Sequence, residues 1–160
     1  MIQVEIRNAE QVVEKLDTMS DRVKARLRDV MGTQTIALRE NVKGKIGTLF
    51  KSPRGPLYQS IRAGAVEETN VSVSSKVFSD GLPYARIQEY GGTTPPHVIL
   101  PKNAKVLAFM GRGGNTVFAR KVNHPGSVIP SRSYLRSSLA ERRLEIIGAI
   151  RGAVDKATQE

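Results

Sequence analysis

The chain has 160 residues, which is enough for one ordinary globular domain. Hydrophobic residues make up 39% of the sequence and charged residues 25%, as in soluble proteins, and no run of about 18 apolar residues suggests a membrane span. Cysteine is absent, which excludes disulfides, thiolate zinc sites and cysteine nucleophiles and fits a reducing cytoplasm.

The charge balance is strongly basic. The 25 Lys and Arg residues outnumber the 15 Asp and Glu residues and give a formal charge of +10. Such an excess favours anionic partners, either nucleic acid or an acidic protein surface. A basic solvated surface with no specific role is the alternative. Aromatic residues are only 5% and tryptophan is absent, which argues against a platform that stacks single-stranded bases.

The N-terminal part predicts one strand and one or two helices. Residues 2–6 alternate apolar and polar like a half-buried strand, and Asn8 is a suitable cap for a helix that opens at Ala9. The pattern fits one long helix, or two that join near residues 17–20 with Ser20 capping the second. Apolar residues recur at helical intervals: Val12, Val13, Leu16, Met19, Val23, Leu27, Val30, Met31, Ile36, Leu38, Val42 and Ile46.

The opposite face of this helix is predicted to be a basic stripe. Its cations are Arg22, Lys24, Arg26, Arg28, Arg39, Lys43 and Lys45. A helix of about 25 residues would spread them over roughly 40 Å. A basic stripe without a motif that reads bases suits non-specific proximity to phosphates, as in a channel wall. It equally suits pairing with acidic residues of another subunit.

Glycines and prolines in residues 47–61 are expected to break the helix. Two strand-like runs follow, residues 60–68 and 71–79, with a turn between them. In the second run valines alternate with serines, which predicts valines on the buried side and serines on the wet side. Asp80 and Gly81 end this run as a turn.

The segment LPYARIQEYGGTTPPH, residues 82–97, predicts a two-turn helix that ends at Gly91. Arg86 and Glu89 are expected to face solvent or a neighbouring subunit, as an ordinary ion pair three residues apart. The residues expected to anchor the helix in the core share a three-residue spacing: Tyr84, Ile87 and Tyr90.

The last part predicts strands HVILP, KVLAFM and NTVFARKV, the latter two joined by the glycine-rich hairpin tip GRGGN, which carries Arg112. Residues 123–133 are expected to form an extended loop, after which Ser131 or Ser133 caps a final helix. The apolar face predicted for that helix is Leu135, Leu139, Leu144, Ile147, Ile150 and Val154.

The expected fold is therefore one α+β domain over residues 1–160. It consists of a long N-terminal helix, an antiparallel β-sheet with a glycine-rich hairpin, a short central helix, and a C-terminal helix packed on the sheet.

Catalysis is not expected. The only histidines, His97 and His124, lie beside prolines and have no Asp, Glu or His cluster at a ligand spacing, so we expect no metal and no cofactor. Glu89 has no evident carboxylate partner for acid–base work. The GRGGNT tip lacks the lysine of a phosphate-binding loop and lies between strands, although Arg112 could still reach a phosphate backbone or an acidic neighbour.

Two segments resemble a known family. They are PYARIQEYGG and IPSRSYLRSSL, the second opening the last helix. Together with the order of elements, they resemble the tail-component, or neck and tail-completion, proteins of tailed bacteriophages. Those proteins carry a Tyr-Ala-x-x-x-Glu-Tyr/Phe-Gly segment and then a Pro-Ala-Arg-Pro-Phe-Leu-Arg-like segment. Ser131 and Ser133 stand where small residues or proline are commoner. The matching residues are Tyr84, Ala85, Glu89, Tyr90, Gly91, Gly92, Ile129, Pro130, Arg132, Tyr134, Leu135 and Arg136.

The resemblance implies a non-enzymatic virion protein, assembled in the bacterial cytoplasm into a ring, expected to have six copies, at the joint between head and tail. Its partners would be other copies, other head–tail connector and tail proteins, and packaged double-stranded DNA approached without sequence specificity, with no membrane. The candidates for subunit interfaces are Tyr84, Arg86, Glu89, Tyr90, Arg132, Tyr134 and Arg136. The candidates for facing DNA in the channel are Arg22, Lys24, Arg26, Arg39, Lys43 and Arg112.

Three other functions remain open on the sequence alone. A tail-terminator ring that caps the tail tube would use the same kind of small α+β subunit. A free nucleic-acid-binding module, such as a toxin or regulator, would show salt-sensitive DNA binding in isolation. A hydrolase that uses Glu89 and His97 would lose its activity when either is replaced.

Overall fold

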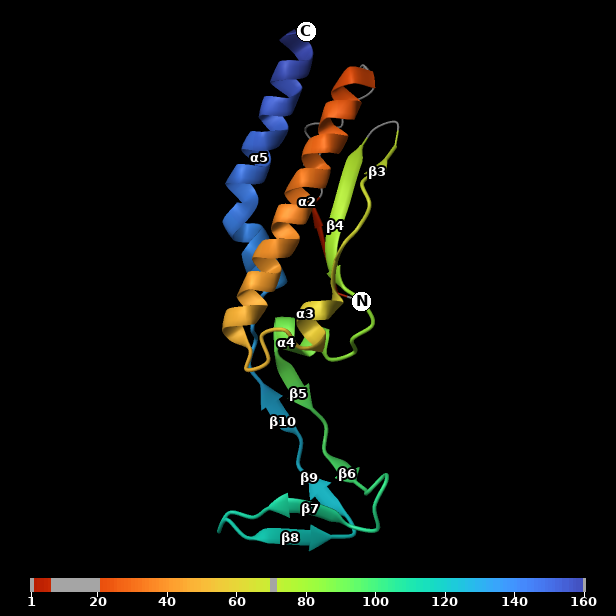
Figure 1. Ribbon diagram of the computed structural model, residues 1–160, viewed down its shortest axis with the longest axis vertical. Coiled ribbons are helices and arrows are strands. Elements are labelled where there is room, and N and C mark those ends of the chain that lie inside the picture. Colours follow the sequence, from red (N-terminus) through yellow and green to blue (C-terminus); the bar gives the residue numbers. More distant parts are fainter. Residues whose placement is uncertain (1, 7–20, 70–71, 160) are drawn as a thin grey trace.

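The computed structural model describes residues 2–6, 21–69 and 72–159. Two long helices lie side by side next to a small antiparallel sheet, and a chain of narrow β-ribbons extends beyond one end of them (Figure 1). The predicted α+β class is confirmed. The elements are β1 (Ile2–Ile6), α2 (Asp21–Leu49), α3 (Pro56–Ser60), β2 (Ile61–Ala63), β3 (Glu67–Glu68), β4 (Val73–Ser79), α4 (Ala85–Tyr90), β5 (Gly92–Thr94), β6 (His97–Ile99), β7 (Leu107–Met110), β8 (Thr116–Ala119), β9 (Val122–His124), β10 (Ser127–Ile129) and α5 (Leu135–Gln159).

Helix α2 is 29 residues long, about 43 Å at the usual rise. The apolar spacing predicts its buried face well, with one error: Ile36 is exposed, and Thr35 takes the buried position in that turn. The helix also runs past Gly47, and the second half of the predicted break folds into the short helix α3. The expected cap at Asn8, the opening at Ala9, the apolar positions before Asp21 and the joint near residues 17–20 lie outside the described residues.

The sheet has the order β1–β4–β2, and β3 also pairs with β4. The strand expected at residues 2–6 and the second expected run after α3 are confirmed, whereas the first run, residues 60–68, forms two short strands, β2 and β3, separated by residues 64–66. The prediction that the β4 serines face water is wrong for Ser75 and Ser79, which are buried. Residues two apart in a strand share a face, so these serines lie with the buried valines. Thr35 on α2 hydrogen-bonds Ser75, and Ser60 hydrogen-bonds Ser79 at 2.8 Å, so the buried hydroxyls are satisfied.

The Thr35–Ser75 contact ties α2 to the sheet, so Thr35→Ala should lower the free energy of unfolding by about 1–2 kcal/mol. Ser75→Ala should have a similar cost, because each change leaves the other hydroxyl buried without this partner. The double variant should cost less than the two single variants added together, since they share one hydrogen bond. Urea unfolding of the four proteins measures this coupling, and strictly additive costs would contradict it.

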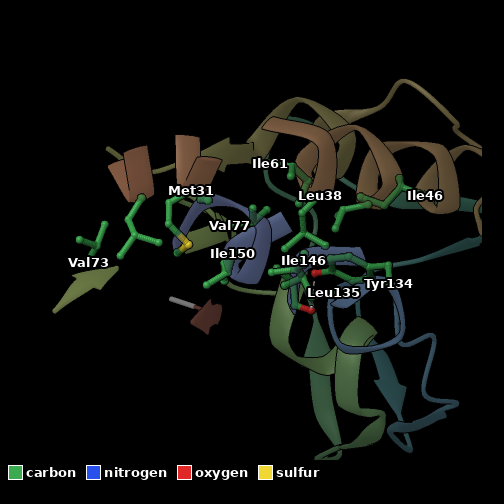
Figure 2. Packing of buried hydrophobic residues seen from close by; sticks show 14 of the residues in the cluster. Met31, Leu38, Ile46, Ile61, Val73, Val77, Tyr134, Leu135, Ile146 and Ile150 are labelled. Carbon is green, nitrogen blue, oxygen red and sulfur yellow. Dashed lines mark hydrogen bonds between the residues drawn. The ribbon is translucent and has the colours of Figure 1, made fainter. Parts of the chain in front are cut away.

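Helix α5 packs mainly along α2 and reaches the sheet at β1. Figure 2 shows side chains of both helices and of β4 meeting in one cluster, with Leu38, Val77 and Ile146 among them. The predicted α5 face is correct at Leu135 and Ile150 but wrong at Leu144, which is 83% exposed. The other fully buried positions of α5 are held by small or branched residues: Ser138, Ile146, Ala153 and Ala157.

The extension beyond the helices consists of three two-stranded antiparallel ribbons, β5–β10, β6–β9 and β7–β8. We call residues 92–129 the arm and the other described residues the body. The strands predicted as HVILP, KVLAFM and NTVFARKV are confirmed, as is the hairpin at GRGGN. The extended loop predicted for residues 123–133 is wrong at residues 123–124, which belong to β9, and at residues 127–129, because β10 pairs with β5, about 33 residues earlier in the chain. A pairing over that distance leaves no local pattern.

Candidate functional site

The short helix α4 connects the body to the arm, and it ends as its sequence predicts. Gly91 has φ 73°, and its N–H donates to the carbonyl oxygen of Ile87 at 2.8 Å. A positive φ favours glycine because a Cβ would be strained there. The chain then turns directly into β5 and the arm.

The carboxylate of Glu89 reaches from α4 to the start of α5. It is fully buried and accepts hydrogen bonds from the backbone N–H groups of Tyr134 at 2.8 Å, Leu135 at 2.9 Å and Arg136 at 3.0 Å. The hydroxyl of Ser133 donates to it at 3.0 Å. Free N–H groups at a helix start need acceptors, and the positive end of the helix dipole favours a negative charge.

Glu89 is therefore the cap of α5, and two predictions made from the sequence are wrong. Glu89 does not face outward, and neither Ser131 nor Ser133 caps the helix. Ser133 donates to Glu89, and the hydroxyl of Ser131 donates to the Glu89 carbonyl oxygen at 2.8 Å. A cap that comes from a segment about 45 residues away has no signature in the local sequence.

Burial by itself would raise the pKa of Glu89. The backbone N–H groups of Leu135 and Arg136, the Ser133 hydroxyl and the N–H of Tyr134 outweigh it, so that the pKa lies below its ordinary value. Arg136 adds its guanidinium, with Nε 3.2 Å from a carboxylate oxygen. Glu89 thus pairs with Arg136 and not, as expected, with Arg86.

This lowered pKa makes the stability depend on pH. Because the folded protein binds the Glu89 proton less tightly than the unfolded chain, the carboxylate stabilises the fold above its unfolded pKa of about 4.3. That contribution is lost as the pH falls through the lower pKa of the folded protein. We expect the free energy of unfolding to fall from pH 5 to pH 3 more steeply in the wild type than in Glu89→Gln. Denaturant unfolding at a series of pH values measures the two slopes, and equal slopes would refute this role of Glu89.

Tyr134 belongs to the second matching segment and is fully buried. It packs beneath the contact between α4 and the start of α5, which we call the α4–α5 junction. Its hydroxyl donates to the Ala85 carbonyl oxygen at 3.1 Å, and its ring meets that of Phe50 edge to face. Burial and the neighbouring Glu89 charge raise the pKa of the Tyr134 phenol. Tyr134 and Glu89 consequently hold the subunit itself together, and their side chains are not available to a neighbouring subunit.

The tyrosines expected to anchor α4 are instead on its outside. Tyr84 is 40% exposed and Tyr90 is 48% exposed, while Ala85 and Glu89 take the buried positions. The Arg136 guanidinium lies 4.5 Å from the centre of the Tyr90 ring. Two of the interface candidates, Tyr90 and Arg136, are thus engaged by the chain's own contacts. The candidates that lie at the surface around α4 are Tyr84, Arg86, Tyr90 and Arg136.

Arg132 lies between this surface and the end of α2. Its guanidinium is 5.2 Å from the centre of the Phe50 ring and donates to the Gln88 side-chain oxygen at 3.1 Å. It borders a groove of about 520 Å³. The groove is lined by Leu49, Phe50, Lys51, Ser52, Gly55, Pro56, Leu57, Tyr84, Gln88 and Arg132.

The predicted basic stripe on α2 is wrong, because its cations point to different neighbours. Arg28 pairs with Glu68 of β3, Lys45 pairs with Glu141 of α5, and the Lys43 ammonium lies 4.9 Å from the centre of the Tyr58 ring. Arg39 pairs with its neighbour Glu40 at 2.7 Å. Of the DNA-facing candidates, Arg22 is exposed at the start of α2, Arg112 is exposed at the β7–β8 tip, and the half-buried ones are Lys24, Arg26, Arg39 and Lys43.

The arm is a second candidate surface. None of its residues is buried, and it exposes large apolar side chains in every ribbon or connection: Val98, Ile99, Leu100, Val106, Phe109, Met110, Phe118 and Val128. Groups of exposed large apolar side chains are typical of interaction sites. A signal was present in the sequence, since residues 90–140 contain no Asp or Glu and the tip at residues 111–115 is rich in glycine.

The structure gives Glu89 and His97 separate partners. Glu89 is held by α5, whereas the His97 ring stacks on that of His124 in the β6–β9 ribbon, with ring centres 4.9 Å apart. The Gly126 N–H donates to His124 Nδ1 at 3.0 Å. Across residues 2–6, 21–69 and 72–159, no group of three His, Asp or Glu residues is arranged to hold a metal ion.

Within that same part of the chain, no helix has the length and apolar character needed to cross a bilayer. No family model matches the sequence, and neither a curated protein nor a solved structure matches it. The function therefore has to be argued from the residues and contacts of this chain.

Proposed function

We propose that the chain is a structural, non-enzymatic component of a tailed-phage particle. In this proposal copies form a ring, of six subunits, at the junction of head and tail and around the DNA channel. The partners are other copies, the connector and tail proteins on either side, and passing double-stranded DNA. The ring is assembled in the host cytoplasm and remains in the virion.

The observation that carries the proposal is the contact between the two segments that resemble the neck and tail-completion proteins. Glu89 of the first segment caps the helix that the second segment opens, and Tyr134 of the second hydrogen-bonds to Ala85 of the first. The shared Glu and aromatic positions thus have a common structural reason. They build one junction that fixes α5 against α4 and sets the direction in which the arm leaves the body.

The arm supports an assembly role over an enzymatic one. It offers exposed apolar side chains and open ribbon edges, which suit contact with other proteins. The groove beside α4 is lined by the polar residues Lys51, Ser52, Tyr84, Gln88 and Arg132 and by apolar residues, but its lining, within the described part of the chain, includes no carboxylate or imidazole that could act as the acid or base of a hydrolase.

The net charge of +10 supports proximity to DNA without sequence reading. Of the cations named as DNA-facing candidates, Arg22 and Arg112 are exposed and the others are half-buried. Arg22 and Arg112 are therefore best able to face a channel. Arg39 and Lys43 already have contacts in their own chain, so α2 as a whole is a poor channel wall.

Removing the gene from the phage or prophage that encodes this chain tests the proposal. We expect DNA-filled heads and separate tails in electron micrographs, and a loss of infectious particles that a plasmid copy of the wild-type gene restores. A plasmid copy of Glu40→Ala, a change at an exposed surface ion pair, should restore them equally. A normal yield of joined, infectious particles without the gene would overturn the proposal.

A further inference from the structure

The β7–β8 ribbon at the far end of the arm has one face turned fully to solvent. The strand register places Ala108 opposite Phe118 and Met110 opposite Thr116, so these four side chains share one face. All four are exposed, with Met110 at 75% and Phe118 at 67%. We call them the ribbon face. The opposite face holds Leu107, Val117 and Ala119, which are half-buried, and Phe109.

This ribbon has little to stabilise it in an isolated subunit. A two-stranded ribbon is marginal in water unless a further strand, helix or partner covers its apolar face. Both outer edges of β7–β8 also lack a paired strand among the described residues, and such edges invite pairing with another chain. The ribbon face therefore needs a protein surface against it.

The charges on the arm decide how such a partner is oriented. The arm carries Lys102, Lys105, Arg112, Arg120 and Lys121 and no Asp or Glu. Two arms packed face to face would bring like charges together, which disfavours a two-fold contact between arms. All the carboxylates of the chain lie outside the arm, so a second copy offers an acidic surface only on the rest of its chain.

One place in the described part of the body combines an exposed apolar side chain with acidic neighbours on both sides. Leu144 on α5 is 83% exposed. Glu141, three residues before it, and Glu145, directly after it, keep more than half of their side chains exposed, although each also pairs with a cation of its own chain, Lys45 and Arg142. An apolar residue at such a position has no role in the core of its own subunit.

We infer that the ribbon face of one copy packs on α5 of a second copy at Leu144, with the arm cations beside Glu141 and Glu145. The inference rests on the ring-forming part of the proposed function and names the two surfaces that would build the ring. The two contacting surfaces differ. When two copies are joined, one copy therefore keeps its α5 surface and the other keeps its ribbon face, and each can bind a further copy. A contact of this kind continues from subunit to subunit and closes into a ring when the rotation between copies allows it.

The purified full-length protein tests this inference through its oligomeric state, measured by analytical ultracentrifugation over a range of concentrations. Met110→Ser with Phe118→Ser in one protein, and Leu144→Asp in another, should each raise the dissociation constant between subunits roughly tenfold or more. Ile36→Ser, at an apolar residue of α2 that is 53% exposed, is the control and should leave assembly unchanged. All these side chains are exposed, so thermal unfolding should show that the variants remain folded.

Mixing the two defective proteins separates this contact from its alternatives. The ribbon variant keeps Leu144 and the α5 variant keeps its ribbon face, so together they should form a complex of two subunits although neither assembles alone. Assembly of Leu144→Asp at wild-type strength would overturn the inference, as would a wild-type protein that stays monomeric at all concentrations. Either result leaves the gene-deletion phenotype, and with it the proposed virion role, as a separate question.

Discussion

Glu89→Ala is expected to lower the free energy of unfolding by about 3–5 kcal/mol at neutral pH, the largest effect of any single change at the α4–α5 junction. The carboxylate accepts three backbone N–H groups and one hydroxyl in a fully buried position. Alanine leaves the N–H groups at the start of α5 without an acceptor and leaves Arg136 without its carboxylate partner. Urea or guanidinium unfolding measures the loss.

Glu89→Gln separates the hydrogen bonds from the charge. The amide keeps one oxygen that can accept N–H groups, so roughly half of the cost of the alanine variant should remain. Glu40→Ala is the control for removal of any glutamate, because Glu40 is exposed and pairs only with the adjacent Arg39 in the contacts described, so about 0.5 kcal/mol or less is expected. A cost for Glu89→Ala as small as that for Glu40→Ala would show that the cap does not support the fold.

Gly91→Ala is expected to cost about 2–4 kcal/mol, for two reasons that add. Gly91 has φ 73°, a conformation strained for any residue with a Cβ. In addition, the new Cβ would lie 2.8 Å from the backbone N of Ser131 and 3.0 Å from the carbonyl oxygen of Ile129. These are backbone atoms of the segment that leads into α5, so they cannot move aside without displacing the junction.

Gly81→Ala provides the control for backbone strain alone. Gly81 has φ 70°, yet no atom lies within 4 Å of the Cβ position. Its substitution should cost about 1 kcal/mol, the strain without the clash. Thermal or denaturant unfolding of both variants measures the difference, and equal costs at the two glycines would contradict the close packing of Gly91 on residues 129–131.

Much of the fold follows from local patterns in the sequence. Three- and four-residue spacing identifies α2 and most of its buried face, alternation identifies β4, and glycines mark the end of α4 and the β7–β8 tip. These features depend on residues close together in the chain. The error at Ile36 comes from following apolar residue type: the 31–35–38 spacing puts Thr35 on the buried face, where Ser75 of β4 is a hydrogen-bond partner for its hydroxyl.

The candidate site was harder to predict, because its central group belongs to two segments at once. The sequence alone predicts that Glu89 is a surface residue that pairs with Arg86, three positions earlier. Only in the folded chain does the start of α5 lie against the Glu89 carboxylate. Ala85 and Glu89 take the buried positions of α4, which leaves Tyr84 and Tyr90 on its exposed side. The prediction of a basic stripe on α2 is wrong for a similar reason. Three different elements, α5, β3 and α3, each contact a different cation of α2.

A reconstruction of the purified particle by electron cryomicroscopy tests the central claim most directly, that this chain is a ring-forming component of the head–tail junction. The account predicts a ring at that junction into which the α2–α5 body fits, with each arm reaching the α5 helix of the neighbouring subunit. Particles whose junction contains no density for this fold, together with no peptide of this chain in their mass spectra, would contradict it.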